Sequence, residues 1–250
     1  MIKKTLFILL FIAYPLSAQF IQHSSIQALD YYICQEKHAP QDVLIIFDLD
    51  NTLIHPITEV GSDQWLEHAA KKEAQEKSIT LAQAYQNLLP LYYKVQDLID
   101  LQLVEKLATD LISKLQSAGI RVIGLTMRSH PIIERTISQL NRLHISFSPL
   151  HAQEIALEGF AKDPVYKDGI IFCSSNDKGV ILFEFLNRFG IKPKKIFCLD
   201  DKHHHLEKVH AAAIKNGVEC LCIHYVGCND RVQNFDHIQA EQELLALNVG

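Results

Sequence analysis

The sequence lacks a run of basic residues. Lysine and arginine number 24 against 29 aspartates and glutamates, which gives a formal net charge of −5. A net acidic chain without a basic run is poorly suited to non-specific nucleic-acid binding, so we expect no nucleic-acid partner. Internal repeats, low-complexity tracts and flexible linkers are also missing. With 48% hydrophobic and 21% charged residues, the composition is that of a folded globular chain.

The chain also lacks an apolar run long enough for a good membrane span. The apolar run at residues 6–13 is short and is followed by Pro15. Two lysines precede it, and small residues follow, which is the pattern of a secretory signal peptide at residues 1–18. An uncleaved anchor or a buried N-terminal helix are the alternatives. Cleavage near Gln19 would change the formal charge to −7 and leave a periplasmic or secreted protein without a stable membrane span.

Cysteine pairs with C-x-x-C spacing are absent, which argues against a zinc or thiol redox site of that type. Four of the six cysteines lie in apolar segments that are typical of buried strands: Cys173, Cys198, Cys220 and Cys222. We therefore expect most of the thiols to be free and buried, although export would permit one disulfide involving Cys34 or Cys228.

Apolar strands alternate with amphipathic helices along most of the chain. Strands are predicted at residues 43–49, 120–126, 169–175, 194–200 and 218–225, and helices at residues 103–119, 130–143, 177–190 and 201–217. A further short helix is expected to begin at Ser24 or Ser25. This alternation predicts an α/β fold in which a doubly wound parallel sheet, within a core domain at residues 19–250, is covered by helices on both faces.

Residues 55–102 interrupt this alternation. They contain a helical pattern at residues 63–89 that Pro90 is expected to close. We interpret the segment as a small helical cap inserted after the first strand. Trp65, at the entry to this insertion, is more typical of a core residue than of a ligand contact.

The stretch "FDLDNT" places Asp48 and Asp50 directly after the first predicted strand. Residues two apart lie on the same side of a strand, so the two carboxylates repel unless a cation or a proton intervenes. The other predicted strands end near Thr126 and near Asp200 with Asp201, while Lys178 begins a helix. Because ligands bind at the carboxyl ends of strands in such sheets, we expect these side chains to converge.

Converging carboxylates favour Mg²⁺, which prefers oxygen ligands, and a magnesium–carboxylate site suits phosphoryl transfer. An aspartate can attack phosphorus to give an aspartyl-phosphate. A second carboxyl group can then protonate the leaving oxygen and later deprotonate the attacking water.

The motifs "DLDNT", "GLTMR", the lysine before an amphipathic helix and "FCLDD" resemble, in this order, those of the haloacid-dehalogenase-like phosphatases. The resemblance covers nearly the whole mature chain outside the insertion and implies a Rossmann-like core. "VGSDQWL" and "LDDKHHHL" further resemble an exported bacterial branch of that superfamily, from which no substrate carries over.

The resemblance implies a role for each motif residue. Asp48 would be the nucleophile and a metal ligand, and Asp50 the general acid and base, with its carbonyl oxygen on Mg²⁺. Thr126 and Lys178 would hold the phosphoryl oxygens. Asp200 would complete the metal site, and Asp201 would orient waters on the metal.

Several assignments have alternatives. Lys162 or Lys167 could take the role of Lys178, and Asp200 or Asp201 could cap the helix that follows. Arg128 could bind a substrate anion or form a surface salt bridge. The three histidines at residues 203–205 are expected on a solvated helix surface, because consecutive residues do not share a helix face.

The sequence therefore predicts an exported Mg²⁺-dependent phosphohydrolase acting on a small phosphorylated substrate. A phosphate-binding or protein-interaction scaffold and a phosphotransferase or phosphomutase are the alternatives, because a fold does not fix a function. The pattern leaves the oligomeric state open.

Overall fold

The computed structural model describes residues 20–249, whose core is an eight-stranded sheet with the order β1-β10-β9-β2-β5-β8-β7-β6. The strands are β1 (Phe20–His23), β2 (Val43–Phe47), β5 (Arg121–Thr126), β6 (Ile155–Ala156), β7 (Val165–Lys167), β8 (Ile170–Phe172), β9 (Lys195–Asp200) and β10 (Glu219–Tyr225). The six strands from β1 to β8 in this spatial order run parallel, while β7 and β6 extend the sheet as antiparallel strands. The predicted parallel sheet is thus confirmed with an antiparallel edge.

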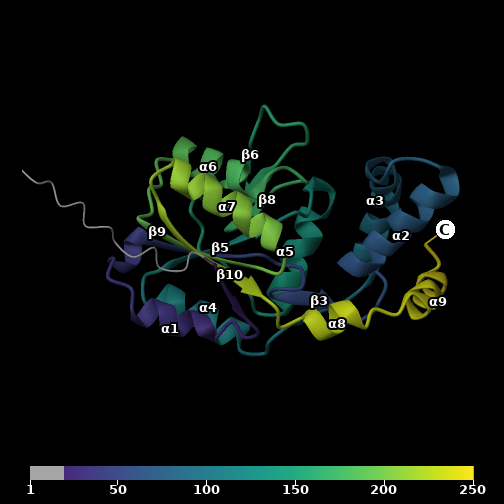
Figure 1. The fold of residues 1–250 in the computed structure, drawn as a ribbon, viewed down its shortest axis with the longest axis horizontal. Helices are drawn as coiled ribbons and strands as arrows, with labels where there is room; N and C mark the ends of the chain where they lie inside the picture. Colours follow the sequence, from purple (N-terminus) through teal and green to yellow (C-terminus); the bar gives the residue numbers. More distant parts are fainter. Residues whose placement is uncertain (1–19, 250) are drawn as a thin grey trace, which may run out of the picture.

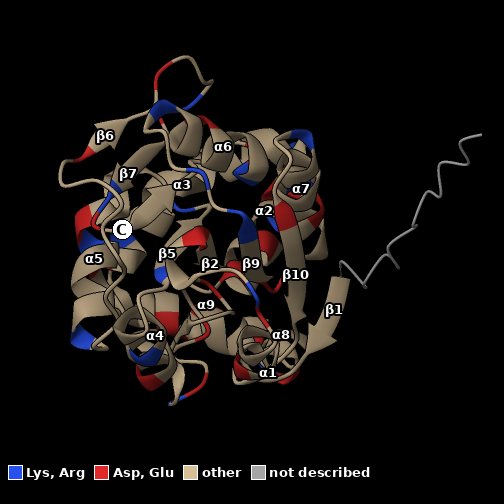
Figure 2. Cartoon of the chain, turned by 90° about the vertical axis from the view of Figure 1, so that its left-hand side faces the viewer, with Lys and Arg blue, Asp and Glu red and all other residues tan. Residues whose placement is uncertain are grey.

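Helices cover both faces of the sheet (Figures 1 and 2). One face packs against α1 (Ala28–Cys34), α4 (Ala108–Ser117) and α5 (Ile133–Arg142), and the other against α6 (Lys178–Arg188) and α7 (His203–Lys215). Strand β2 is central and wholly buried, because all five of its residues are apolar and each face meets a helix layer. The 3₁₀ helices η1 (Pro40–Asp42) and η2 (His130–Ile132) precede β2 and α5.

The insertion consists of two helices on a two-stranded stem. Strands β3 (Ile54–Pro56) and β4 (Leu101–Leu103) pair antiparallel, and between them lie α2 (Asp63–Lys77) and α3 (Leu81–Leu98). In Figure 1 this helix pair stands beside the core at the end of the molecule that also holds the C-terminus.

The prediction of one helix at residues 63–89 closed by Pro90 is wrong. The chain breaks at Ser78, which adopts a left-handed conformation, and Thr80 then begins α3 through a capping box with Gln83. Pro90 lies inside α3 instead of ending it. Its side chain is exposed, so the carbonyl group that loses a helical hydrogen bond to proline can face water.

Strand β1 and the start of α1 also differ from expectation. Residues 20–23 pair in parallel with β10, so the insertion follows the second strand of the chain and not the first. Helix α1 begins at Ala28. Ser25 does not cap it but donates its hydroxyl hydrogen to Glu105 Oε2 at 2.8 Å. A four-residue strand is too short to carry a clear periodic signal.

Two further helices, α8 (Asn229–Gln233) and α9 (His237–Leu247), carry the chain from the sheet to the insertion (Figure 1). Glu243 on α9 accepts hydrogen bonds from the backbone N–H groups of Glu59 and Val60 at 2.7 and 2.9 Å. The rings of His68 and His237 stack with centroids 4.9 Å apart. The C-terminal segment therefore ties the insertion to the core.

All six cysteines carry free thiols, five of them buried, as predicted, with Cys34 exposed. Trp65 is buried and stacks on Tyr92, in keeping with a core role. The predicted signal peptide lies outside the described residues. Among the helices at residues 20–249, none has the length and apolar character that crossing a membrane requires.

Candidate active site

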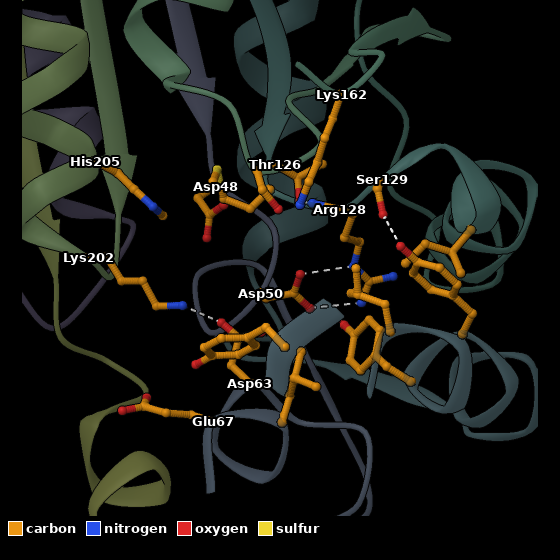
Figure 3. A pocket seen from close by; sticks show the side chains of 18 of the residues that line it. Asp48, Asp50, Asp63, Glu67, Thr126, Arg128, Ser129, Lys162, Lys202 and His205 are labelled. Atoms are coloured by element: carbon orange, nitrogen blue, oxygen red, sulfur yellow. Dashed lines mark hydrogen bonds and ion pairs between the residues drawn. The ribbon is translucent and has the colours of Figure 1, made fainter. Parts of the chain in front are cut away.

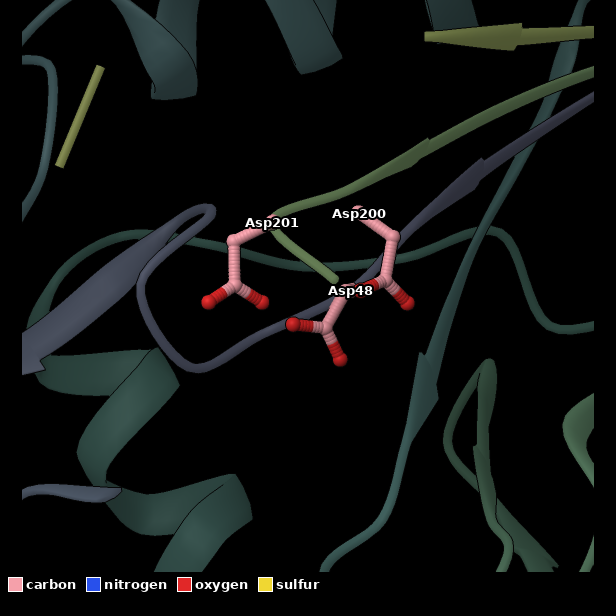
Figure 4. Close-up of side chains that lie close together, drawn as sticks. All are labelled: Asp48, Asp200 and Asp201. Atoms are coloured by element: carbon pink, nitrogen blue, oxygen red, sulfur yellow. The ribbon is translucent and has the colours of Figure 1, made fainter. Parts of the chain in front are cut away.

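Three carboxylates meet where β2 and β9 end. Asp48 follows β2, Asp200 ends β9 and Asp201 comes next in the chain. Each contributes an oxygen atom, and these atoms all lie within 4.8 Å of one another (Figure 4). The two strands are neighbours at the point where the strand order reverses direction, which is where α/β sheets bind ligands. Three of the four carboxylates predicted to converge thus do so, and Asp50 is not part of this cluster.

Lys178, the first residue of α6, lies between two of these carboxylates. Its Nζ is 2.6 Å from Asp48 Oδ1 and 2.6 Å from Asp200 Oδ2. Helix α6 can approach the site because Gly179 packs on α7, where a Cβ atom would stand 2.2 Å from the carbonyl oxygen of Lys208. Lys167, an alternative for this role, instead pairs with Glu134 and Glu154.

The acidic cluster has unusual electrostatics because Asp48 and Asp200 are buried and Asp201 is partly buried. Burial opposes the negative charge of Asp200, but Lys178 and His205 hold its pKa well below the usual range. Burial and the neighbouring acids raise the pKa of Asp48, which Lys178 offsets only in part. Burial, with Asp200 and Asp63 nearby, raises the pKa of Asp201 to about 7. The pKa of Lys178 is raised by its two carboxylates despite burial, so the ammonium group remains charged.

Asp50 points away from this cluster and binds Arg128. Nε and Nη2 of Arg128 donate to the two carboxylate oxygens at 2.9 and 2.8 Å, in a bidentate pair (Figure 3). Nη1 donates to Thr136 at 3.0 Å and to Gln139 at 3.2 Å. Of the five N–H donors of a guanidinium group, these contacts leave one for a substrate. The alternative of a surface salt bridge is wrong, because Arg128 is only 5% exposed.

The turn after β2 brings the remaining motif residues to the site. Asn51 adopts a left-handed conformation, and its side-chain amide donates to Asp201 Oδ2 at 3.3 Å. The Thr52 hydroxyl donates to Asp48 Oδ2 at 3.3 Å. Thr126, buried at the end of β5, accepts a hydrogen bond from the backbone N–H of Arg128 through its Oγ1.

Three residues near the site escaped sequence reasoning. Asp63, on the first turn of α2, forms an ion pair with Lys202, so the insertion and the core meet here (Figure 3). His205 is buried, which overturns the predicted solvated surface for this member of the histidine run. Helix α7 turns it inward, and its Nδ1 lies 3.4 Å from Asp200 Oδ2. Two features of the sequence indicate Asp63 and Lys202: the polar pair Ser62–Asp63 at a helix start, and the lysine directly after "LDD".

A cavity of about 630 Å³ opens between this site and the insertion (Figure 3). Asp48, Asp50, Thr126 and Asp201 line its core side. The opposite wall comes from α2 and α3: Leu66, Ala82, Tyr85, Leu89, Tyr92 and Tyr93. The volume is typical of sites that hold small molecules.

The arrangement defines a class of α/β protein with an acidic site at the switch point of its sheet. A family model described as "Protein of unknown function (DUF2608)" matches residues 22–247. The chain belongs to this family.

Relatives of this chain include proteins of Chlamydia and Rickettsia. A Chlamydia pneumoniae protein named "Putative outer membrane protein" is 25% identical over 72% of this chain and 68% of its own length. A Chlamydia trachomatis protein of the same name is 20% identical over 88% of this chain and 83% of its own length. An uncharacterized protein of Rickettsia prowazekii is 27% identical over 84% of this chain and 79% of its own length.

Proposed function

We propose that this protein is a Mg²⁺-dependent phosphohydrolase of the haloacid-dehalogenase-like type, with a small phosphomonoester as its substrate. The observation that carries the proposal is the position of Lys178 between Asp48 and Asp200, 2.6 Å from each. A buried cation beside a strand-end aspartate can hold a phosphoryl group against that aspartate. The motif residues at four strand or helix ends support the same reading.

The residues at the site fit a magnesium ion. Asp48, Asp200 and Asp201 supply carboxylate oxygens close enough to share one cation, and oxygen is the ligand that Mg²⁺ prefers. Nδ1 of the nearby His205 is buried without a hydrogen-bond partner among the described residues. The side chain of Asp50 faces Arg128, so its predicted part in the metal site rests on its backbone carbonyl group. When bound, Mg²⁺ would offset negative charge on the phosphate oxygens.

The nucleophilic step belongs to Asp48. Its carboxylate oxygen forms a bond to phosphorus as the ester P–O bond breaks, and an aspartyl-phosphate results. Lys178 and Thr126 bind the phosphoryl oxygens during the transfer. Lys178 also offsets the charge of Asp48, which eases the approach of an anionic substrate.

Proton transfer belongs to Asp50, two residues further along the chain. In the proposed cycle, one Asp50 oxygen leaves Arg128 and carries a proton before the transfer. Asp50 gives this proton to the leaving alkoxide, then regains one from the water that attacks phosphorus and releases phosphate from Asp48. Arg128 fixes the direction of the Asp50 carboxylate through its bidentate contact. We therefore propose Arg128 chiefly as a positioning residue, with its remaining N–H available to the substrate.

We place this activity in the cell envelope or beyond it. The proposal rests on the signal-peptide pattern of residues 1–18 and on the names of the two Chlamydia relatives.

The test is hydrolysis of p-nitrophenyl phosphate by purified protein with and without Mg²⁺. We expect turnover that requires Mg²⁺ and that Asp48→Asn abolishes, because the amide cannot serve as the nucleophile. Asp110→Asn, at an exposed position of α4, is the matched control and should keep full activity. Folded wild-type protein that hydrolyses no phosphoester in the presence of Mg²⁺ would contradict the proposal.

A further inference from the structure

The cap helix α3 presents a regular face to the cavity. Its lining residues recur at helical spacing: Ala82, Tyr85, Gln86, Leu89, Tyr92 and Tyr93. Tyr85, Leu89 and Tyr93 are only partly buried, so this face does not pack fully against protein. Leu66 from α2 adds to the apolar wall, and Met127 and Ile132 add to it from the core.

Most of the basic side chains that line the cavity are engaged in ion pairs. Arg128 is occupied by Asp50, and Lys202 by Asp63. Among the described residues, Lys162 is the lysine or arginine of this lining without an ion-pair partner, and it reaches into the cavity in Figure 3. Glu67 on α2 lines the cavity beside the apolar wall. Glu67 is paired with Lys71. An anionic leaving group would therefore meet no unpaired lysine or arginine from the cap.

A hydrogen bond at the cavity joins cap and core, in addition to the Asp63–Lys202 ion pair. The hydroxyl groups of Tyr93 and Ser129 lie 2.7 Å apart (Figure 3). This contact fixes the hydroxyl end of Tyr93, a residue of the cavity wall, to the core. A phosphoryl group bound at Asp48 fills only part of the volume, so the rest must take the alcohol part of the ester.

We propose that α3 selects a phosphomonoester whose alcohol part is uncharged and apolar, with an aromatic ring as the group that best matches the tyrosine faces. The inference rests on the proposed phosphohydrolase function and adds the substrate class. Tyrosine rings and leucine side chains gain most from apolar contact, and offset or edge-on ring pairs add to it. Sugar phosphates and bisphosphates carry hydroxyl or phosphate groups where this wall offers apolar contact.

The experiment compares three esters of alkyl alcohols, so that the leaving groups differ mainly in shape and polarity: benzyl phosphate, ethyl phosphate and glycerol 3-phosphate. With Mg²⁺ present, we expect kcat/KM for benzyl phosphate to exceed that for ethyl phosphate by about tenfold or more. Tenfold corresponds to about 1.4 kcal/mol, within reach of burying one ring. Glycerol 3-phosphate should not exceed ethyl phosphate.

A matched pair of variants assigns the preference to the helix face. Leu89→Asn places an amide in the apolar wall and should bring the benzyl-to-ethyl ratio close to one. Leu81→Asn makes the same change on an exposed position of α3 outside the cavity and should leave the ratio unchanged. Calorimetry with benzylphosphonate and methylphosphonate gives a second readout that needs no turnover, and the benzyl compound should bind about tenfold more tightly.

The outcomes separate the two proposals. Hydrolysis of all three esters at equal rates, or a preference for glycerol 3-phosphate, would overturn the substrate class and leave the phosphohydrolase standing. Tight benzylphosphonate binding without turnover of any ester would support the apolar subsite and contradict the enzyme. Neither turnover nor phosphonate binding would overturn both.

Discussion

Lys178 is a charged side chain that the fold buries almost completely, with 1% exposure, between Asp48 and Asp200. Burial of a charge costs energy that only close partners offset, and removal of one partner leaves the others uncompensated. The three side chains therefore form one electrostatic unit that links β2, α6 and β9. This unit serves stability as well as the proposed chemistry.

The first residue-scale prediction concerns this unit. Lys178→Met should lower the free energy of unfolding by about 3–5 kcal/mol in EDTA, because two buried carboxylates lose their counter-charge. Saturating Mg²⁺ should recover part of the loss. Urea unfolding at pH 7 measures both effects, with Lys94→Met at an exposed position of α3 as the control. A loss below about 0.5 kcal/mol would show that Lys178 does not offset the acids.

Asp201 gives a pH-dependent prediction. Burial beside Asp200 and Asp63 raises its pKa from 3.8 to about 7, so the fold favours its protonated form. Ionisation of Asp201 therefore destabilises the protein progressively as the pH rises from about 4 to about 7.

Asp201→Asn removes this ionisation. In EDTA, the variant should gain stability over the wild type across the same pH window and level off at about 2–4 kcal/mol above pH 7. Urea unfolding curves at several pH values check the result. A difference between the two proteins that does not change with pH would contradict the assigned pKa shift.

The sequence predicted which residues lie at the site better than it predicted which side chains they contact. Strand ends of a parallel sheet share one edge, and this rule predicted Asp48, Thr126 and Asp200. Lys178 was predicted from its place at the start of a helix. The pairing of Arg128 with Asp50 was missed, since it depends on α5, whose Thr136 and Gln139 fix the guanidinium group. Such contacts arise between segments distant in sequence, and a local pattern carries no record of them.

At the scale of elements, the same distinction holds. Strands such as β2 and β9 were predictable because a short apolar run between two amphipathic helices is typical of a buried strand. The break at Ser78 was not predictable, because the helical spacing of apolar and charged residues continues on both sides of this one left-handed residue. Strand β1 was missed because its four residues become a strand only through pairing with β10.

Helix α9 supports a prediction about residues 59 and 60, which lead into α2 and are called the hinge of the insertion here. Glu243→Ala removes the acceptor of the Glu59 and Val60 amides, and bonds to a charged acceptor contribute about 1.5–3 kcal/mol. Hydrogen exchange of these two amides should become about tenfold faster or more. Glu241→Ala on the same helix, which loses only an exposed ion pair with Lys72, is the control. Equal exchange in both variants would show that α9 does not hold the hinge.

At the scale of the whole molecule, the insertion forms one wall of the cavity above the acidic site. The sheet supplies an acidic centre at its switch point, and α2 and α3 enclose it with an apolar wall. Lysines and arginines are interspersed with acidic residues along the ribbon in Figure 2. In the proposed function, the core thus carries the chemistry and the cap selects the substrate.

The central claim is that Asp48 becomes phosphorylated, and one measurement tests it directly. Asp50→Asn keeps the nucleophile but lacks the base that activates water, so the phosphoenzyme should accumulate with p-nitrophenyl phosphate, whose leaving group needs little protonation. The variant is mixed with this ester and Mg²⁺, quenched in acid, digested and analysed by mass spectrometry. We predict a peptide containing Asp48 that is heavier by one phosphoryl group, and its loss in the Asp48→Asn, Asp50→Asn double variant. Release of nitrophenolate with Asp48 unmodified, or with the phosphoryl group on another residue, would contradict the account.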